Sequence, residues 1–204
     1  MDILIDNGHG NDTPGKRSPI WSDGTQLFEF EFNRDVAKRL FKLLQINGID
    51  CKMIVPEEID ISLPERVRRI NKIYEQEKKC FLVSIHANAG GGSGWEIFTS
   101  PGETESDVIA DFFVKSAIKN LSKFKLRSDF SDGDADKEAR FYMLRKTKCP
   151  AVLTENLFMD TERDCRFIMS NYGRNVIAKL HFDAINSYLK NNYDKIIQRK
   201  IRCR

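Results

Sequence analysis

The stretch DILIDNGHG, residues 2–10, contains most of what decides the fold. Its apolar centre, Ile3 to Ile5, is short and bounded by polar residues, which is typical of a buried strand. The Asn-Gly-His-Gly that follows ends the strand and places His9 directly after it. Two later apolar runs behave in the same way, since 81–85 leads into His86 and 151–154 leads into Glu155.

Amphipathic segments separate these apolar runs. We expect strands at 2–6, 51–55, 81–86, 95–99 and 151–154, and helices at 27–45, 62–78, 106–120, from 162 onward, and at 173–191. Ser62 and Glu65 have the spacing of a capping box for the second of these helices. Strands that alternate with helices indicate one α/β domain with a largely parallel sheet.

Composition and charge argue against two classes of protein, nucleic-acid-binding and membrane-spanning. The 204 residues carry 33 basic and 30 acidic side chains, a net charge of +3. Six of the basic side chains lie in 190–204, which leaves 27 basic and 29 acidic residues elsewhere. This balance argues against nucleic-acid binding by the main domain, and no apolar run approaches the ~20 residues of a membrane span. We expect a globular domain over 1–190 and a basic tail over 191–204, either solvated and frayed or attracted to an anionic polymer.

Cysteine usage and the first residues indicate how the chain is made. The five cysteines are irregularly spaced and contain no C-x-x-C pair, so we expect reduced thiols rather than a disulfide framework or a cysteine zinc site. An apolar run begins directly after Met1-Asp2 and leaves no room for a signal peptide. The sequence therefore predicts either a chain made without a leader or one whose leader has been removed.

Three chemically capable side chains follow the predicted strands. Because parallel strands end at the same edge of a sheet, we expect His9, His86 and Glu155 to project from one edge. Two imidazoles together with a carboxylate and an open position form a common catalytic zinc site. Each histidine alone has a structural alternative, and the alternative for Glu155 is a buried acid paired with Arg145 or Arg163.

A carboxylate ligand is available on the helix predicted at 27–45. Helical steps of three, seven and eleven residues from Glu29 reach Phe32, Val36 and Leu40, so Glu29 lies on the buried face. Steps of four, seven and eleven residues from Glu31 reach charged residues, at 35, 38 and 42, on a solvated face. A carboxylate on an apolar face is costly to bury unless it is paired or coordinated, which favours Glu29 as the ligand. Its alternative is an acid that interacts favourably with the amino-terminal end of the helix dipole.

Four motifs together carry a family resemblance: IDNGHG at 5–10, Glu29 with Asn33, SIHAN at 84–88 and LTENLF at 153–158. In this order the chain resembles the zinc-dependent N-acetylmuramoyl-L-alanine amidases of the Amidase_3 family. The resemblance implies a twisted mixed sheet flanked by helices on both faces. It also implies that His9, Glu29 and His86 bind Zn²⁺ and that Glu155 is the catalytic carboxylate. The chain departs from the family pattern at 11–19 and at Asn156-Leu157, where a small residue is frequent.

The resemblance also implies the reaction. We expect a monomer that hydrolyses the amide between N-acetylmuramic acid and L-alanine in peptidoglycan and so acts on the bacterial cell wall, as a lysis enzyme of phage type or as a remodelling enzyme. The alternatives are a zinc peptidase with another peptide substrate and a wall-binding module without catalysis.

Several further features have simpler interpretations. Gly90–Gly94 lacks the ending of a phosphate-binding loop, so we expect a flexible connection beside His86. The acidic segment 128–138 lacks the spacing of a calcium loop, which predicts a solvated loop. His181 lies in the middle of a helix and is expected to be structural. Glu96 is expected to support the site or the strand pairing, and Arg145 is a candidate for binding a peptide carboxylate or for a surface ion pair.

Overall fold

One six-stranded sheet with the strand order β2-β1-β3-β6-β4-β5 forms the centre of the structure. The computed structural model describes the backbone of residues 1–202 and the side chains of residues 1–193. The strands are β1 (Asp2–Asn7), β2 (Cys51–Met53), β3 (Cys80–Asn88), β4 (Trp95–Thr99), β5 (Lys137–Glu138) and β6 (Ala151–Phe158). The helices are α1 (Glu29–Ile46), α2 (Leu63–Glu77), α3 (Glu105–Asn120), α4 (Tyr142–Lys146), α5 (Glu162–Met169) and α6 (Asn171–Arg202). Because β4 is antiparallel to β6 and the other pairings are parallel, the predicted mostly parallel mixed sheet is confirmed.

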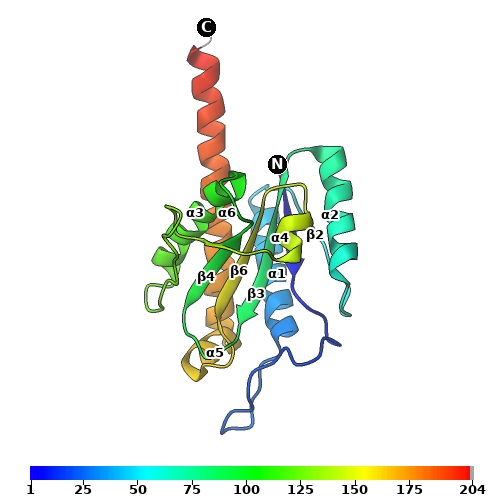
Figure 1. The fold of residues 1–204 in the computed structure, drawn as a ribbon, viewed down its shortest axis with the longest axis vertical. Helices are drawn as coiled ribbons and strands as arrows, with labels where there is room; N and C mark the ends of the chain where they lie inside the picture. The colour runs from blue at the N-terminus through cyan, green and yellow to red at the C-terminus, as the bar shows by residue number, and fades with distance from the viewer. Residues whose placement is uncertain (203–204) are drawn as a thin grey trace.

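Helices cover both faces of the sheet, as expected (Figure 1). The larger core lies between one face and α1, α3 and α6, where Ile5 and Val83 meet helix residues such as Phe32 and Phe113. The smaller core lies on the other face, where Leu4 and the neighbouring strands meet α2 and α4. Alternate strand residues serve the two cores because successive side chains of a strand point to opposite faces.

The face with the smaller core changes character along its strands. Leu82 and Leu153 belong to the apolar cluster beneath α2 and α4. Further along the same strands this face carries His86 and Glu155 in place of apolar residues, and these two residues are direct register partners. Apolar burial therefore ends about halfway along the sheet, and the carboxyl-terminal half of this face is left to polar side chains.

Two strands continue further than the sequence predicts. β3 includes His86 and extends to Asn88, and β6 includes Glu155 and extends to Phe158. The prediction that His86 and Glu155 follow the ends of their strands is therefore wrong, because hydrogen bonding continues past both of them. Leu157 has a φ of 69°, in the left-handed region that favours glycine, which gives a backbone reason for the small residue frequent in the family pattern.

The start of α2 and the end of α6 also differ from expectation. Ser62 is the N-cap of α2 but makes no side-chain capping hydrogen bond, so the predicted capping box is wrong; a capping box is present instead at Thr104 of α3. Glu65 pairs with Arg68 and Arg69. Helix α6 passes the expected domain boundary and projects from the end of the molecule opposite to the carboxyl ends of the parallel strands (Figure 1).

Four cysteines, at positions 51, 80, 149 and 165, are free thiols, as expected. Cys203 lies outside the described residues. Over the residues that the structure describes, no helix is long and apolar enough to cross a lipid bilayer.

The loop 90–94 between β3 and β4 is anchored, contrary to the expectation of a flexible connection. The backbone N–H groups of Gly90 and Gly91 both donate to Asp160 Oδ2, at 2.7 and 2.8 Å. Asp164, fully buried, accepts hydrogen bonds from the other end of the same loop. Two acids that follow β6 therefore hold this loop beside the end of β3.

The acidic segment 128–138 is only partly solvated. Residues 137–138 form strand β5, and Asp136 is 3% exposed, where its Oδ2 accepts a hydrogen bond of 2.7 Å from Thr99. The prediction of a solvated loop is therefore wrong at Asp136. Burial, together with the adjacent Asp134, raises the pKa of Asp136 to about 7.

This raised pKa predicts a specific dependence of stability on pH. The unfolded chain ionises Asp136 near pH 4 and the folded chain near pH 7, so the folded state binds more protons between these values and loses stability as the pH rises. Asp136→Asn keeps an acceptor for Thr99 and removes this loss, which is at most about 3 kcal/mol between pH 5 and 7. Urea unfolding of both proteins at pH 5, 7 and 8 measures it. An identical pH dependence in the two proteins would contradict the assignment.

Candidate metal centre

The first ligand candidate, His9, stands in a turn that β1 and α1 hold together. Its φ is 64°, so the backbone reverses directly after the strand. Asn33 donates from its side chain to the carbonyl of Gly8 at 3.0 Å, and Arg34 donates to the carbonyl of His9 at 3.3 Å. Two consecutive side chains of α1 therefore fix the turn that carries the imidazole.

Glu29 is the first residue of α1 and is 1% exposed. Its Oε1 accepts from the backbone N–H of Ala87 at 3.2 Å and lies 3.1 Å from His86 Nδ1. Its Oε2 lies 3.3 Å from His9 Nε2 and makes no hydrogen bond. The helical periodicity predicts that Glu29 is buried and Glu31 exposed, and the structure confirms both.

The close contacts within this group shift the pKa values of Glu29 and His86. Burial alone would raise the pKa of Glu29, but the imidazoles of His86 and His9, at 3.1 and 3.3 Å from its two oxygens, outweigh it and hold this pKa well below its usual range. Burial likewise opposes protonation of His86, yet the hydrogen bond with Glu29 leaves the pKa of the imidazole raised. The two rings meet edge to face, with centroids 5.1 Å apart.

The donor set and its spacing fit a zinc ion. His9, Glu29 and His86 each offer a ligand atom, and these atoms all lie within 4.8 Å of one another. Two ligands at ~2.0–2.1 Å on a tetrahedral ion are separated by about 3.3 Å. The contacts of 3.3 and 3.1 Å from Glu29 to the two imidazoles are close to that value. The orphaned Oε2 of Glu29 is an acceptor that such an ion would satisfy.

Glu155 lies one strand away, on β6, as the register partner of His86 on β3. It is half-buried, and its Oε2 is without a hydrogen-bond partner. Burial raises the pKa of Glu155 to about 7, with His86 opposing the rise and the carboxylates of Glu29 and Glu96 adding to it. Among the described side chains neither Arg145 nor Arg163 pairs with Glu155, so that alternative is not observed.

Glu96 is the direct partner of Glu155 on the antiparallel strand β4 and is 4% exposed. It accepts hydrogen bonds from Asn88, Arg127 and Lys137, the second at 2.9 Å. A supporting role for Glu96 is expected from the sequence, whereas the contacts of Arg127 and Lys137 with it are not. Arg127 lies in an irregular segment, and Lys137 begins β5, a two-residue strand that is too short to show a periodicity in the sequence.

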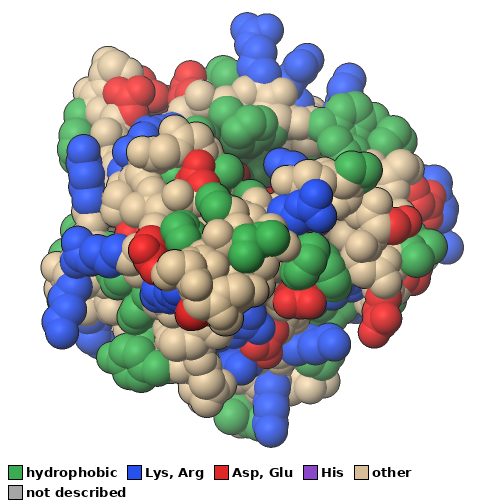
Figure 2. Space-filling model, turned by 90° about the horizontal axis from the view of Figure 1, so that it is seen from below, with side chains coloured by type: hydrophobic (Ala, Val, Ile, Leu, Met, Phe, Trp, Pro, Cys, Tyr) green, Lys and Arg blue, Asp and Glu red, His purple; other side chains and the backbone are tan. Residues whose placement is uncertain are grey.

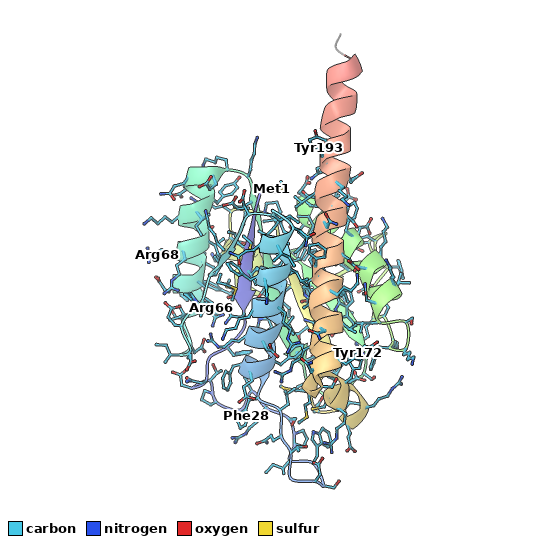
Figure 3. All side chains as sticks on the ribbon, turned by 180° about the vertical axis from the view of Figure 1, so that it is seen from behind. Met1, Phe28, Arg66, Arg68, Tyr172 and Tyr193 are labelled. Carbon is cyan, nitrogen blue, oxygen red and sulfur yellow. The ribbon has the colours of Figure 1, made fainter. Side chains whose placement is uncertain are left out.

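The other side of the centre contains a buried ion pair. Arg66 points from α2 towards the sheet, whereas Arg68 points away from it (Figure 3). The guanidinium of Arg66 donates to Asp6 at 2.7 Å and to the carbonyl of Asn7 at 3.1 Å. A cavity of about 370 Å³ lies against this pair and is also lined by His9 and His86.

The described side chains at this end of the molecule form no broad charged patch (Figure 2). Seen from the end towards which the parallel strands run, lysine and arginine side chains are scattered among acidic and apolar ones (Figure 2). His181 is fully buried, with its ring nitrogens 2.9 Å from Thr154 Oγ1 and 2.8 Å from the carbonyl of Ile177. Its predicted structural role is confirmed.

Comparison with known proteins identifies the family. Residues 3–187 match Amidase_3, described as N-acetylmuramoyl-L-alanine amidase. The chain belongs to this family.

Relatives and solved structures agree with this membership. N-acetylmuramoyl-L-alanine amidase CwlM of Bacillus licheniformis is 28% identical over 184 residues, which cover 90% of this chain and 66% of CwlM. The endolysin of Bacillus phage SPP1 is 26% identical, over 92% of this chain and 65% of its own length. The chain thus spans just under two thirds of these relatives. The N-acetylmuramoyl-L-alanine amidase structure from Clostridium difficile 630 has a TM-score of 0.77 at 25% identity, covering 93% of this chain and 96% of the other.

The packing of Gly8 against His86 yields a prediction. A Cβ at Gly8 would lie 2.1 Å from His86 Cε1, so Gly8→Ala must displace the imidazole. We expect the purified protein to retain its fold and to lose at least half of its zinc on dialysis, measured by elemental analysis with circular dichroism.

Gly24→Ala is the matched control. Gly24 has a φ of 80° and open space around it, so alanine strains the backbone there without approaching a ligand. Equal zinc content in the two variants would show that the position of the His86 ring does not matter for the metal.

Proposed function

We propose that this chain is a zinc-dependent amidase that hydrolyses the bond between N-acetylmuramic acid and L-alanine in peptidoglycan. The observation that carries the proposal is the meeting of His9, His86 and buried Glu29 beside the unpaired oxygen of Glu155. Hydrolysis of an amide needs an activated water and a proton for the leaving nitrogen, and this group of residues can meet both needs.

The metal would be held by His9, Glu29 and His86. Three protein ligands of the nitrogen and oxygen type leave a position open, as in catalytic rather than structural zinc sites. When bound, zinc supplies Lewis acidity that polarises the amide carbonyl and lowers the pKa of water to about 7.

Glu155 would carry the proton. A carboxyl with a pKa of about 7 is divided between its two protonation states near neutrality, so it can both accept and donate a proton. Its Oε2 is free to receive the proton of the attacking water and to deliver it to the leaving amine. Arg34 and Asn33 act through the turn of His9 as positioning residues.

The substrate follows from the family. The relatives include proteins named sporulation-specific N-acetylmuramoyl-L-alanine amidase, in Bacillus subtilis, and endolysin, in a Bacillus phage. We infer that the chain acts on the bacterial cell wall. A peptidase with another substrate and a wall-binding module without catalysis are the outcomes that product analysis separates from this proposal.

The basic region 191–204 is proposed to add affinity for anionic wall polymers. Residues 191–202 belong to the end of α6 that projects away from the candidate centre (Figure 1), so such binding would not block the site. Residues 203–204 lie outside the described residues.

Glu155→Gln is the direct test. The substitution keeps the shape of the side chain but removes its ability to take a proton, so we expect unchanged zinc content and a fall in turnover of at least ~100-fold. Mass spectrometry of purified peptidoglycan after digestion, with and without a chelator, identifies the bond that is cut.

Glu103→Gln, at an exposed carboxylate, is the control and should retain wild-type turnover. Cleavage within the peptide instead of at the lactyl amide would support a peptidase. Zinc binding with no hydrolysis by the wild type would support the binding module.

A further inference from the structure

Two cations converge on one buried anion beside Glu155. Glu96 faces Glu155 across the β4–β6 pairing, and its Oε2 accepts from both Arg127 and Lys137. Directly opposed residues of antiparallel strands have Cβ atoms ~4.5–5.5 Å apart. The cations bound to Glu96 are therefore within one side-chain length of the proposed proton carrier.

The guanidinium of Arg127 is fixed in position but incompletely bonded. Its Nε donates to Glu96 at 2.9 Å, and its plane lies over the ring of Phe158, 5.0 Å from the centroid. The side chain is 30% exposed. Within residues 1–193 no partner accepts a hydrogen bond from its two terminal amino groups, so both remain available to a ligand.

The nearby acids Asp129 and Glu138 do not form ion pairs with Arg127 or Lys137. Asp129 accepts a hydrogen bond from the backbone of Ser131, and Glu138 accepts one from the backbone N–H of Gly102. Among the described side chains Glu96 is the only acid in an ion pair with Arg127 or Lys137. Two positive charges thus share the negative charge of Glu96, and both cationic side chains are partly exposed, Arg127 at 30% and Lys137 at 25%.

We propose that Arg127 is a carboxylate-binding residue that recognises a free carboxylate on the peptide side of the substrate. An arginine with two free terminal donors binds a carboxylate in a planar, two-point arrangement that lysine cannot reproduce. The muramoyl carboxyl is consumed in the bond that is cut, so a free carboxylate near that bond belongs to the peptide. This inference rests on the proposed function and adds a preference for acidic over amidated peptides.

Arg145, the candidate from the sequence, is less suited to this role. It is exposed on the short helix α4, and no described carboxylate pairs with it. Nothing comparable to the Glu96 contact and the Phe158 ring holds its guanidinium in one orientation. Binding through a side chain that is already fixed loses less conformational entropy, which favours Arg127.

A pair of substrates that differ in one group tests the proposal. N-acetylmuramoyl-L-alanyl-D-glutamine, the acid, and N-acetylmuramoyl-L-alanyl-D-glutamine amide, the amide, differ only in one carboxylate against one carboxamide, and the amide has no other free carboxylate. We expect the zinc-loaded full chain to have a KM about 10-fold lower for the acid at similar kcat. Arg127→Met should abolish this preference by raising KM for the acid alone, and Arg127→Lys should keep only part of it.

A merely structural role for Arg127 gives a different result. Loss of its contact with Glu96 would then change both substrates equally, and such parallel changes would overturn the proposal. Arg163→Met is the control, because Arg163 also lies over a phenylalanine ring, that of Phe124, but contacts none of the residues of the centre. It should retain the wild-type preference.

Failure of the proposed function is distinguishable from failure of this inference. If the wild type cleaves neither substrate, the amidase assignment fails, and titration calorimetry with the same two compounds then decides whether the carboxylate is recognised. Equal affinity of the wild type for the acid and the amide would overturn the role of Arg127. Tighter binding of the acid that is lost in Arg127→Met would support it.

Discussion

The buried carboxylate of Glu29 is the constraint on which the rest of the site depends. An acid that is 1% exposed needs compensation, and it obtains this from two imidazoles and one backbone N–H. His9 follows β1, and His86 and Ala87 both belong to β3, so β1, β3 and the start of α1 must meet at one point. Gly8 permits this meeting because any side chain there would collide with the His86 ring.

The sequence predicts this centre well because its signals are periodic. The helical face separates Glu29 from Glu31, and apolar runs locate His9 and His86 near the ends of neighbouring strands. Family motifs then connect these residues with Glu155. The structure brings all four together, while their roles in metal binding and catalysis remain predictions.

The surroundings of the centre could not be derived in the same way. Strands β3 and β6 extend past His86 and Glu155 because they remain paired there. Polar residues lie within these extensions, and their sequence does not predict a strand. Arg127 reaches its position because a long irregular segment returns to β4. Such a segment has no sequence periodicity, so its contacts cannot be predicted from the sequence. Burial of Asp136 is also a consequence of tertiary packing. A run of acidic residues predicts exposure to solvent, and the sequence does not show that packing encloses one of them.

The division of one sheet face into a covered and an uncovered half has a consequence for how a polymer could be approached. Helices α2 and α4 pack over the Leu4 side, and the half that carries His86 and Glu155 has no helix above it. A ligand lying across such a surface need not be threaded by a free end. A long polymer could therefore be bound at an interior point as readily as at one of its ends.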